Sequence, residues 1–403
     1  MKNIVATLIL NFSLLILIYP TQAHADVWDT LCIDNYRVDT AEIGALKAEV
    51  NALAFFQDNE LSGKLMKGYT LPGAWLQPKL SITPIPQIHL EAGVHLMLYH
   101  GANRYPNYAY HDIATWKGDQ YQRGVHALPY FRAQANVKNL VLVLGDIYGA
   151  QNHQLIRPMF NPEQNLSTDP EMGFQMLLDR RHVHLDLWLN WQSYIFNLDT
   201  HQEAFTVGIN STIHWNRDKS KSLQWETPLQ ILLQHRGGEQ DITNAGVQTL
   251  CNGSAGLRLT YKPKGRNVLT SLRAETNVMG SWQQHGTIWP FETGLALHAG
   301  VNAVFFRDLN VELGYFTSPR QYANLFGSPL FGTISLKYPG VTYEGMHTPY
   351  ASVGYAHQFT SAYRLGAQVD LYNTCTKGSS NFLFDFGVYL RVCPDFVIKK
   401  GKK

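Results

Sequence analysis

Apolar and polar residues alternate with a period of two along most of the chain. In "DRRHVHLDLWLNWQ" (179–192), the odd positions from Val183 to Trp191 are apolar, and most even positions from His182 to Gln192 are polar. A period of two indicates a β-strand with one apolar and one polar face. The apolar face of such a strand is covered either by protein or by lipid, and the rest of the sequence has to decide between the two.

The same alternation recurs along the chain. Six further segments show it, at residues 45–56, 88–100, 205–215, 268–278, 363–372 and 382–392. Repeated amphipathic strands of this length, separated by turn residues, are typical of an outer-membrane β-barrel. The pattern is weakest at Leu140–Tyr148, where both faces are apolar, and at Phe174–Asp179, which is short.

The connections between the predicted strands fall into two sets. Every second connection is short and polar, such as "TPIP" at Thr83 or "RDLN" at Arg307, and three of the others are very long, at 101–124, 149–173 and 317–348. Outer-membrane barrels alternate short periplasmic turns with longer extracellular loops. The sequence therefore predicts an all-β, up-and-down antiparallel transmembrane barrel of about sixteen strands, with both termini in the periplasm.

The N-terminus has the layout of a secretory signal peptide. Lys2 precedes the apolar run "IVATLILNFSLLILIYP", and Ala23 and Ala25 form a small-residue cleavage site. We expect residues 1–25 to be removed and residues 26–403 to form one barrel domain. An uncleaved N-terminal membrane anchor is the alternative.

Charge and cysteine content add two constraints. The formal net charge is +2, so no strong field points to a nucleic-acid partner. The four cysteines follow no metal-binding spacing, and no metal or cofactor site is expected. Cys32 and Cys393 lie near the two ends of the mature chain, which a closed barrel brings together; whether they form a disulfide is left open.

Taken together, the signal peptide, the alternating strands and the sorted connections resemble a Gram-negative porin-type β-barrel. The resemblance is architectural, covers nearly all of the mature chain and places it in the bacterial outer membrane. One departure is the C-terminus, where the chain continues past the last predicted strand as "CPDFVIKKGKK" instead of ending on an aromatic residue. The resemblance implies outer-membrane lipid and the barrel-assembly machinery as partners, with homo-oligomers left open.

A barrel of sixteen to eighteen strands is wide enough for an aqueous channel. The sequence is accordingly interpreted as a passive channel for small polar solutes and not as an enzyme. The charged residues predicted to line the pore are Glu91, Arg132, Asp186, Arg258, Arg273, Glu275, Asp370, Asp385 and Arg391. They either create a transverse field or simply form ion pairs along the wall.

The connection at 101–124 is the predicted constriction loop. Its candidate residues are Tyr105, Tyr108, Tyr110, Asp112, Trp116, Asp119 and Tyr121. The same aromatic residues suit a glycan-binding surface, which is one alternative function.

A lipid-modifying enzyme is the other alternative function. It would need a nucleophile and a base on the lipid side of the barrel. The chain lacks a compact His-x-Ser motif, and Ser211 and His214 point to opposite faces of their strand. The lumen histidines (His89, His95, His126, His182 and His184) are interpreted as hydrogen-bonding residues, because the spacing of His89 and His95 is too wide for one metal ion.

Overall fold

The computed structural model describes residues 26–38, 43–61, 63–100, 126–194, 201–216, 222–238, 246–265 and 267–401. Two short helices and two 3-10 helices accompany the strands: α2 (Val27–Cys32), α4 (Gln164–Ser167), η2 (Ala150–His153) and η3 (Pro329–Phe331). The strands are β1 (Leu46–Glu60), β2 (Tyr69–Ile85), β3 (Ile88–Tyr99), β4 (His126–Val137), β5 (Leu140–Asp146), β6 (Met172–Asp179), β7 (Val183–Ser193), β8 (Ala204–His214), β9 (Leu223–Arg236), β10 (Gln248–Tyr261), β11 (Leu269–His285), β12 (Thr293–Phe305), β13 (Leu309–Ser318), β14 (Met346–Gln358), β15 (Tyr363–Thr376), β16 (Ser379–Val392) and β17 (Asp395–Lys399).

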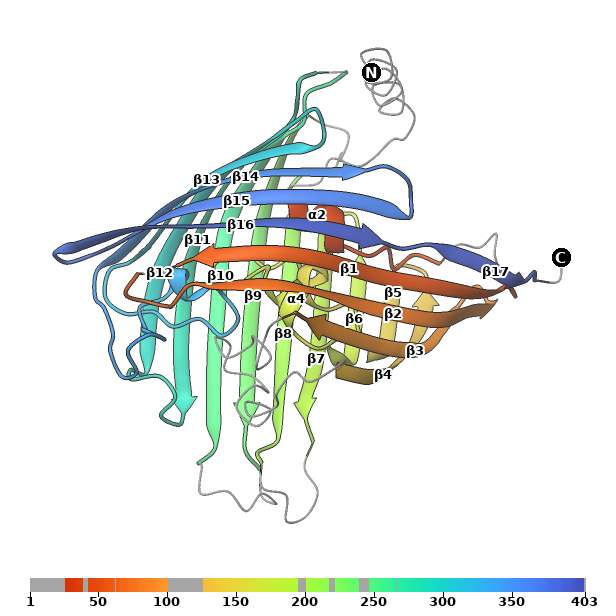
Figure 1. Cartoon of the computed structure of the whole chain (residues 1–403), viewed down its shortest axis with the longest axis horizontal. Helices are drawn as coiled ribbons and strands as arrows, with labels where there is room; N and C mark the ends of the chain where they lie inside the picture. The colour runs from red at the N-terminus through yellow and green to blue at the C-terminus, as the bar shows by residue number, and fades with distance from the viewer. Residues whose placement is uncertain are drawn as a thin grey trace.

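The strands close into one antiparallel barrel. Each strand pairs with its neighbours in the chain, and β1 closes the ring by pairing with both β2 and β16, as Figure 1 shows. The short β17 follows β16 and pairs with β1 beyond it, so the wall has sixteen strands. The predicted all-β antiparallel barrel and its number of strands are confirmed. The departure at the C-terminus is explained, because "DFVIK" forms β17 and extends the pairing with β1.

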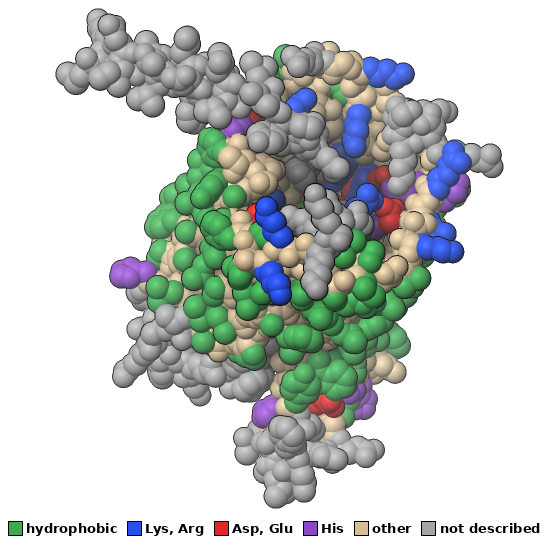
Figure 2. Space-filling model, turned by 90° about the vertical axis from the view of Figure 1, so that its right-hand side faces the viewer, with side chains coloured by type: hydrophobic (Ala, Val, Ile, Leu, Met, Phe, Trp, Pro, Cys, Tyr) green, Lys and Arg blue, Asp and Glu red, His purple; other side chains and the backbone are tan. Residues whose placement is uncertain are grey.

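The period of two separates an outer wall from an inner wall. On β15, Val369 is 44% exposed, whereas its lumen-facing neighbour Gln368 is 6% exposed. Many large apolar side chains on the outer wall of the described chain are exposed, and Figure 2 shows much of the outer surface as hydrophobic. A band of this kind is what lipid contact requires. In the described part of the chain, no helix is long and apolar enough to cross a bilayer.

Besides the apolar outer surface, an apolar core lies inside the barrel. The connections 146–172 and 318–346 fold inward and pack against lumen-facing wall residues such as Val143 and Phe316. Buried side chains from these connections include Ile147, Tyr148, Ile156, Met159, Tyr322, Leu325, Leu330 and Phe331. The lumen is therefore partly filled by protein.

The strands of the barrel wall are shortest at β5 and β6. These strands have 7 and 8 residues, against 12 in β4 and 11 in β7. Strand β5 pairs with β4 only between Arg132 and Val137, so the first six residues of β4 have no β5 partner. The connection 146–172 leaves the wall at this notch and enters the lumen.

Candidate active site

The connection 146–172, here called the inner loop, carries the candidate site. It turns through η2, runs across the lumen, turns again through α4 and returns to β6. Arg157 fastens the loop to the opposite wall: its guanidinium lies 2.6 Å from a carboxylate oxygen of Asp370 and donates to the hydroxyl of Tyr372. The same group lies over the ring of Tyr350. A cation buried among these partners holds the loop in one position.

His153, the last residue of η2, lies between two carboxylates. Its Nδ1 is 2.7 Å from Oδ2 of Asp186 on β7, and its Nε2 is 3.2 Å from Oε2 of Glu171 at the end of the inner loop. The imidazole is only 2% exposed. Each carboxylate is oriented in turn, because Asp186 accepts from Gln175 and Glu171 accepts from the backbone N–H of Ala150.

The two inner-loop groups have pKa values displaced in opposite directions. Burial alone would lower the pKa of His153, but the flanking Glu171 and Asp186 carboxylates outweigh it and raise this pKa to about 9. Burial would raise the pKa of Glu171, but the His153 imidazolium outweighs it and lowers the pKa of Glu171. At neutral pH the site therefore holds a proton donor and a proton acceptor in direct contact.

An indole ring fixes the plane of the imidazole. The rings of His153 and Trp188 are stacked, with centroids 3.6 Å apart and an interplanar angle of 10°. Trp188 pairs across β7 and β8 with Gly208, and a Cβ on Gly208 would meet the indole at 2.0 Å. The absence of a side chain at Gly208 lets the indole lie against β8.

The histidine borders an amphipathic cavity of about 200 Å³. Its apolar lining is Leu128, Leu155, Phe160, Met172, Trp188, Trp191, Tyr194, Leu232 and Phe326, and its polar lining is His153, Gln164, Thr168, Asp169, Glu171, Asn190, Gln192 and Thr206, with Pro170 beside them. Convergent polar groups in a mostly apolar cavity are typical of a small-molecule site. This lining suits a ligand that has an apolar chain and one polar functional group.

The cavity reaches the lipid-facing side of the wall. Trp188 faces the lumen, whereas Trp191 and Met172 fall on the outward phase of β7 and β6. All three line the same cavity, which lies where the inner loop leaves the low part of the wall. Lumen-facing and lipid-facing surfaces thus meet at this cavity.

Two amides beside the cavity have nitrogen atoms available for a ligand. The Oδ1 of Asn190 accepts from the backbone N–H of Met172, and the Oε1 of Gln192 accepts from Thr206 and Gln234. Within the described residues, neither amide nitrogen donates to an acceptor. Such donors next to an acid–base pair suit stabilisation of an oxyanion.

The nine charged residues predicted to line the pore all lie on the lumen side, and ion pairs account for most of them. Glu91 pairs with Arg132 and Lys79, Arg258 with Glu275 and Glu226, and Arg391 with Asp34. Asp370 and Asp385 are opposite each other on β15 and β16, and Arg157 pairs with Asp370. Asp186 belongs to the candidate site, and Arg273 lines a separate lumen cavity.

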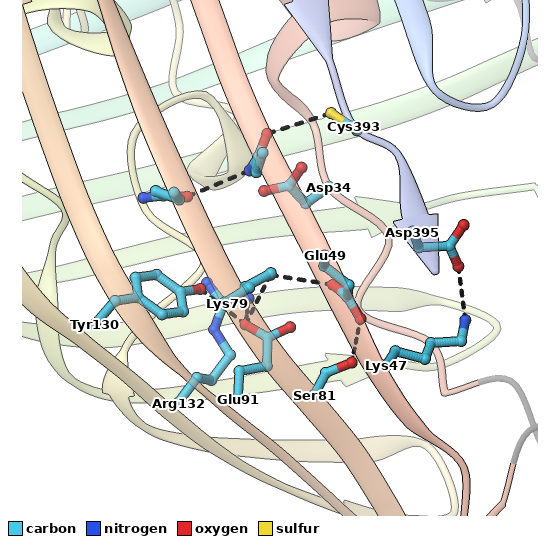
Figure 3. A network of polar contacts seen from close by, with 12 residues as sticks. Asp34, Lys47, Glu49, Lys79, Ser81, Glu91, Tyr130, Arg132, Cys393 and Asp395 are labelled. Atoms are coloured by element: carbon cyan, nitrogen blue, oxygen red, sulfur yellow. Dashed lines mark hydrogen bonds and ion pairs between the residues drawn. The ribbon is translucent and has the colours of Figure 1, made fainter. Parts of the chain in front are cut away.

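A charged network lines the end of the barrel that carries the short turns. Figure 3 shows Lys79 between Glu49 and Glu91, with Arg132 and Tyr130 beside Glu91 and the Glu49–Ser81 contact close by. All of these residues except Ser81 border a cavity of about 290 Å³. The face drawn in Figure 2 shows blue and red side chains gathered around a hollow. Cys32 and Cys393 both line this cavity as free thiols.

The remaining predicted positions divide into two groups. The constriction-loop candidates from Tyr105 to Tyr121 lie outside the described residues. The described histidines form hydrogen bonds: His89 with Thr83 and Glu91, His95 with Gln77, and His126 with Asp169. Sequence reasoning singled out Asp186 as a lumen charge but missed His153, Glu171 and Trp188 as a site, because the inner loop has no periodic pattern.

The closed barrel and its apolar outer wall define the chain as an outer-membrane β-barrel protein of porin-type architecture. Within that class, the chain belongs to the lipid A 3'-O-deacylase-type family, which matches residues 38–401. A comparison with the curated proteins finds no match.

Several solved barrels are similar in overall structure. Acinetobacter baumannii OccAB4 has 9% identity and a TM-score of 0.48, with 89% of this chain and 100% of that chain covered. Pseudomonas aeruginosa OprD has 9% identity and a TM-score of 0.49, with 92% and 99% covered. A loop-deletion mutant of Vibrio cholerae OmpT has 8% identity and a TM-score of 0.49, with 87% and 100% covered.

The family overturns one sequence-based expectation. The chain was expected not to be an enzyme, and that expectation is wrong, because the family is an enzyme family. The lack of a compact His-x-Ser motif does not exclude an enzyme. A barrel brings separate segments together, as with His153, Glu171 and Asp186, so a catalytic set needs no fixed spacing in the sequence.

Proposed function

We propose that the chain is an outer-membrane acyl-ester hydrolase that removes an ester-linked acyl chain from lipid A, the substrate named in the description of its family. The observation that carries the proposal is the contact between His153 and Glu171, whose pKa values are displaced in opposite directions, at a cavity open to the lipid-facing wall. Ester hydrolysis needs one group to accept a proton and another to donate one.

In the proposed reaction, Glu171 accepts a proton from a water molecule that attacks the ester carbonyl. The amide nitrogens of Asn190 and Gln192 stabilise the negative charge on the carbonyl oxygen. His153 donates its Nε2 proton to the departing sugar oxygen, so the ester and water give a carboxylic acid and an alcohol. Because Glu171 and His153 are 3.2 Å apart, the proton on Glu171 then returns to the imidazole.

Access follows from the notch at β5 and β6. We place the long connections, including the inner loop, on the extracellular side, where the outer leaflet contains lipid A. An acyl chain enters past Met172 and Trp191 and lies against Leu128 and Phe160, while its ester reaches His153. The lipid then has no need to leave the bilayer completely.

The decisive experiment measures acyl loss from lipid A by mass spectrometry. We expect the wild-type chain to release one acyl chain, and Glu171→Gln and His153→Gln to lower the rate by about 10²–10⁴-fold. The rate should also fall as pH rises through about 9, because His153 then loses the proton that it donates. Equal rates for the wild type and both variants would contradict the proposal.

His357→Gln is the matched control. His357 also forms a 2.7 Å contact with a carboxylate, that of Asp308, but it does not line the candidate cavity. This variant should keep the wild-type rate.

A passive channel is the second candidate, favoured by the width of the barrel and the charged cavity at its short-turn end. A folded wild-type barrel that leaves lipid A unchanged would move the assignment to this function.

A further inference from the structure

A lumen cavity separate from the candidate site contains excess negative charge. Its volume is about 130 Å³, and its lining includes four carboxylates and three guanidinium groups. These are Asp26, Asp29, Glu275 and Glu312, with Arg157, Arg258 and Arg273, and His298 lies beside them. The four carboxylates outnumber the guanidiniums by one. A buried negative charge without a matching cation is costly.

Asp26 supplies the carboxyl group that makes the acidic groups of this lining outnumber the guanidinium groups. It is the N-cap of α2 and accepts the backbone N–H of Asp29 at 2.7 Å. Burial, reinforced by the neighbouring Asp29 and Glu312, raises the pKa of Asp26 well above its usual range. No cation lies within ion-pair distance of its carboxylate in the described part of the chain.

The predicted cleavage after Ala25 would make Asp26 the first residue of the mature protein. We propose that this cavity is a binding site for the α-ammonium group of the processed N-terminus. Cleavage converts the peptide nitrogen of Asp26 into a cation next to its own carboxylate and in the same cavity as Asp29 and Glu312. With Asp26 ionised beside it, the ammonium group supplies the positive charge that balances four carboxylates against three guanidiniums.

Helix α2 holds this N-terminus inside the barrel. Leu31 packs against Gly366 so closely that a Cβ there would lie 2.7 Å from it, and Trp28 contacts Tyr389 with ring centroids 4.5 Å apart. Arg364 donates to the carbonyl oxygen of Thr30 at 3.0 Å. These contacts fix where the first residue lies.

Binding of the ammonium group also bears on the inner loop. Asp29 accepts from Gln151 at 2.9 Å, and the backbone N–H of Asp34 donates to Asn152 at 2.7 Å. Gln151 and Asn152 belong to η2, as does His153. A change in charge beside Asp29 on removal of the signal peptide would therefore be transmitted to the segment that positions His153. The consequence for catalysis rests on the proposed function, but the binding site itself does not.

Competitive acetylation of the wild-type mature chain tests the site without a mutation. The α-amine of an unfolded chain has a pKa of about 7.7–8.0. In the folded barrel we expect the amine to titrate at least one unit higher and to react at least tenfold more slowly at pH 8 than in the urea-unfolded chain. Equal rates in the two states would overturn the proposal. So would a native mature protein that begins at a residue other than Asp26, as determined by mass spectrometry.

Extension variants provide the second measurement. Gly-Ser placed before Asp26 moves the ammonium group away, whereas Gly-Ser placed after Lys403 is the matched control. Because the pKa of the amine is raised on folding, its stabilisation is complete below about pH 8 and is lost as pH rises through the folded value. The N-terminal extension should lower the unfolding temperature at pH 7, and the difference should shrink toward pH 10. Identical melting profiles for the two extended chains would refute the site. If the wild-type mature chain removes no acyl chain from lipid A, that result refutes only the proposed activity and not this binding site.

Discussion

At the scale of single residues, the candidate site depends on small groups as much as on charged ones. His153 can act as a donor only while Asp186 and Glu171 surround it and Trp188 holds its plane. That plane depends in turn on the missing side chain of Gly208. A methyl group added there would displace the indole and leave both carboxylates in place.

Gly208→Ala should therefore reduce acyl release while the barrel still forms. Overpacking of this kind costs about 1–3 kcal/mol. We expect a lower unfolding temperature and a rate at least tenfold below wild type. Gly253→Ala is the control, because a Cβ on Gly253 has only Gln230 within 4 Å, at 3.9 Å. If both alanines behave alike, the indole does not position His153.

At the scale of elements, the strands could be predicted from the sequence and the site could not. Alternation located strands such as β7 and β16, because lipid on one side and polar lumen groups on the other enforce a period of two. The alternation is weakest at β5, where Val141 and Val143 face the inner apolar core instead of polar groups. The site lies beside this strand, and its histidine comes from a connection whose path depends on long-range packing.

The inner loop is held by one buried cation. Arg157→Ala would leave Asp370 and Glu312 without their partner, and breaking a buried ion pair costs about 3–5 kcal/mol. We expect a clearly lower unfolding temperature by circular dichroism and faster proteolysis within the inner loop. Arg180→Ala, at an exposed turn position, should change stability by no more than about 0.5 kcal/mol. An inner loop that resists protease equally in both variants would show that Arg157 does not anchor it.

At the scale of the whole molecule, the barrel separates three environments: lipid outside, an apolar core inside and polar cavities between that core and the wall. The phase of each strand decides which environment a side chain meets. On β15, the adjacent residues Gln368 and Val369 lie in different environments, because Gln368 faces the lumen and Val369 faces the outer surface.

A positive charge should therefore destabilise the barrel much more at Val369 than at Gln368. Val369→Arg, near the middle of β15, should destabilise the barrel in bilayers by about 2–4 kcal/mol. Gln368→Arg should be mild, because Asp370, which already accepts a hydrogen bond from Gln368, lies beside it. Folding assays in lipid vesicles measure both, and equal losses would mean that the assigned faces of β15 are wrong.

The position of the inner core restricts the order in which the molecule can assemble. The core draws on connections at 146–172 and 318–346, and α2 near the N-terminus packs on β14 and β15 close to the C-terminus. The wall closes only where β1 meets β16 and β17. Once β1 has paired with β16 and β17, a bulky loop could enter the lumen only through one open end of the barrel. We therefore expect the inner segments to pack against a half-open, curved sheet before the first strand joins the last and encloses them.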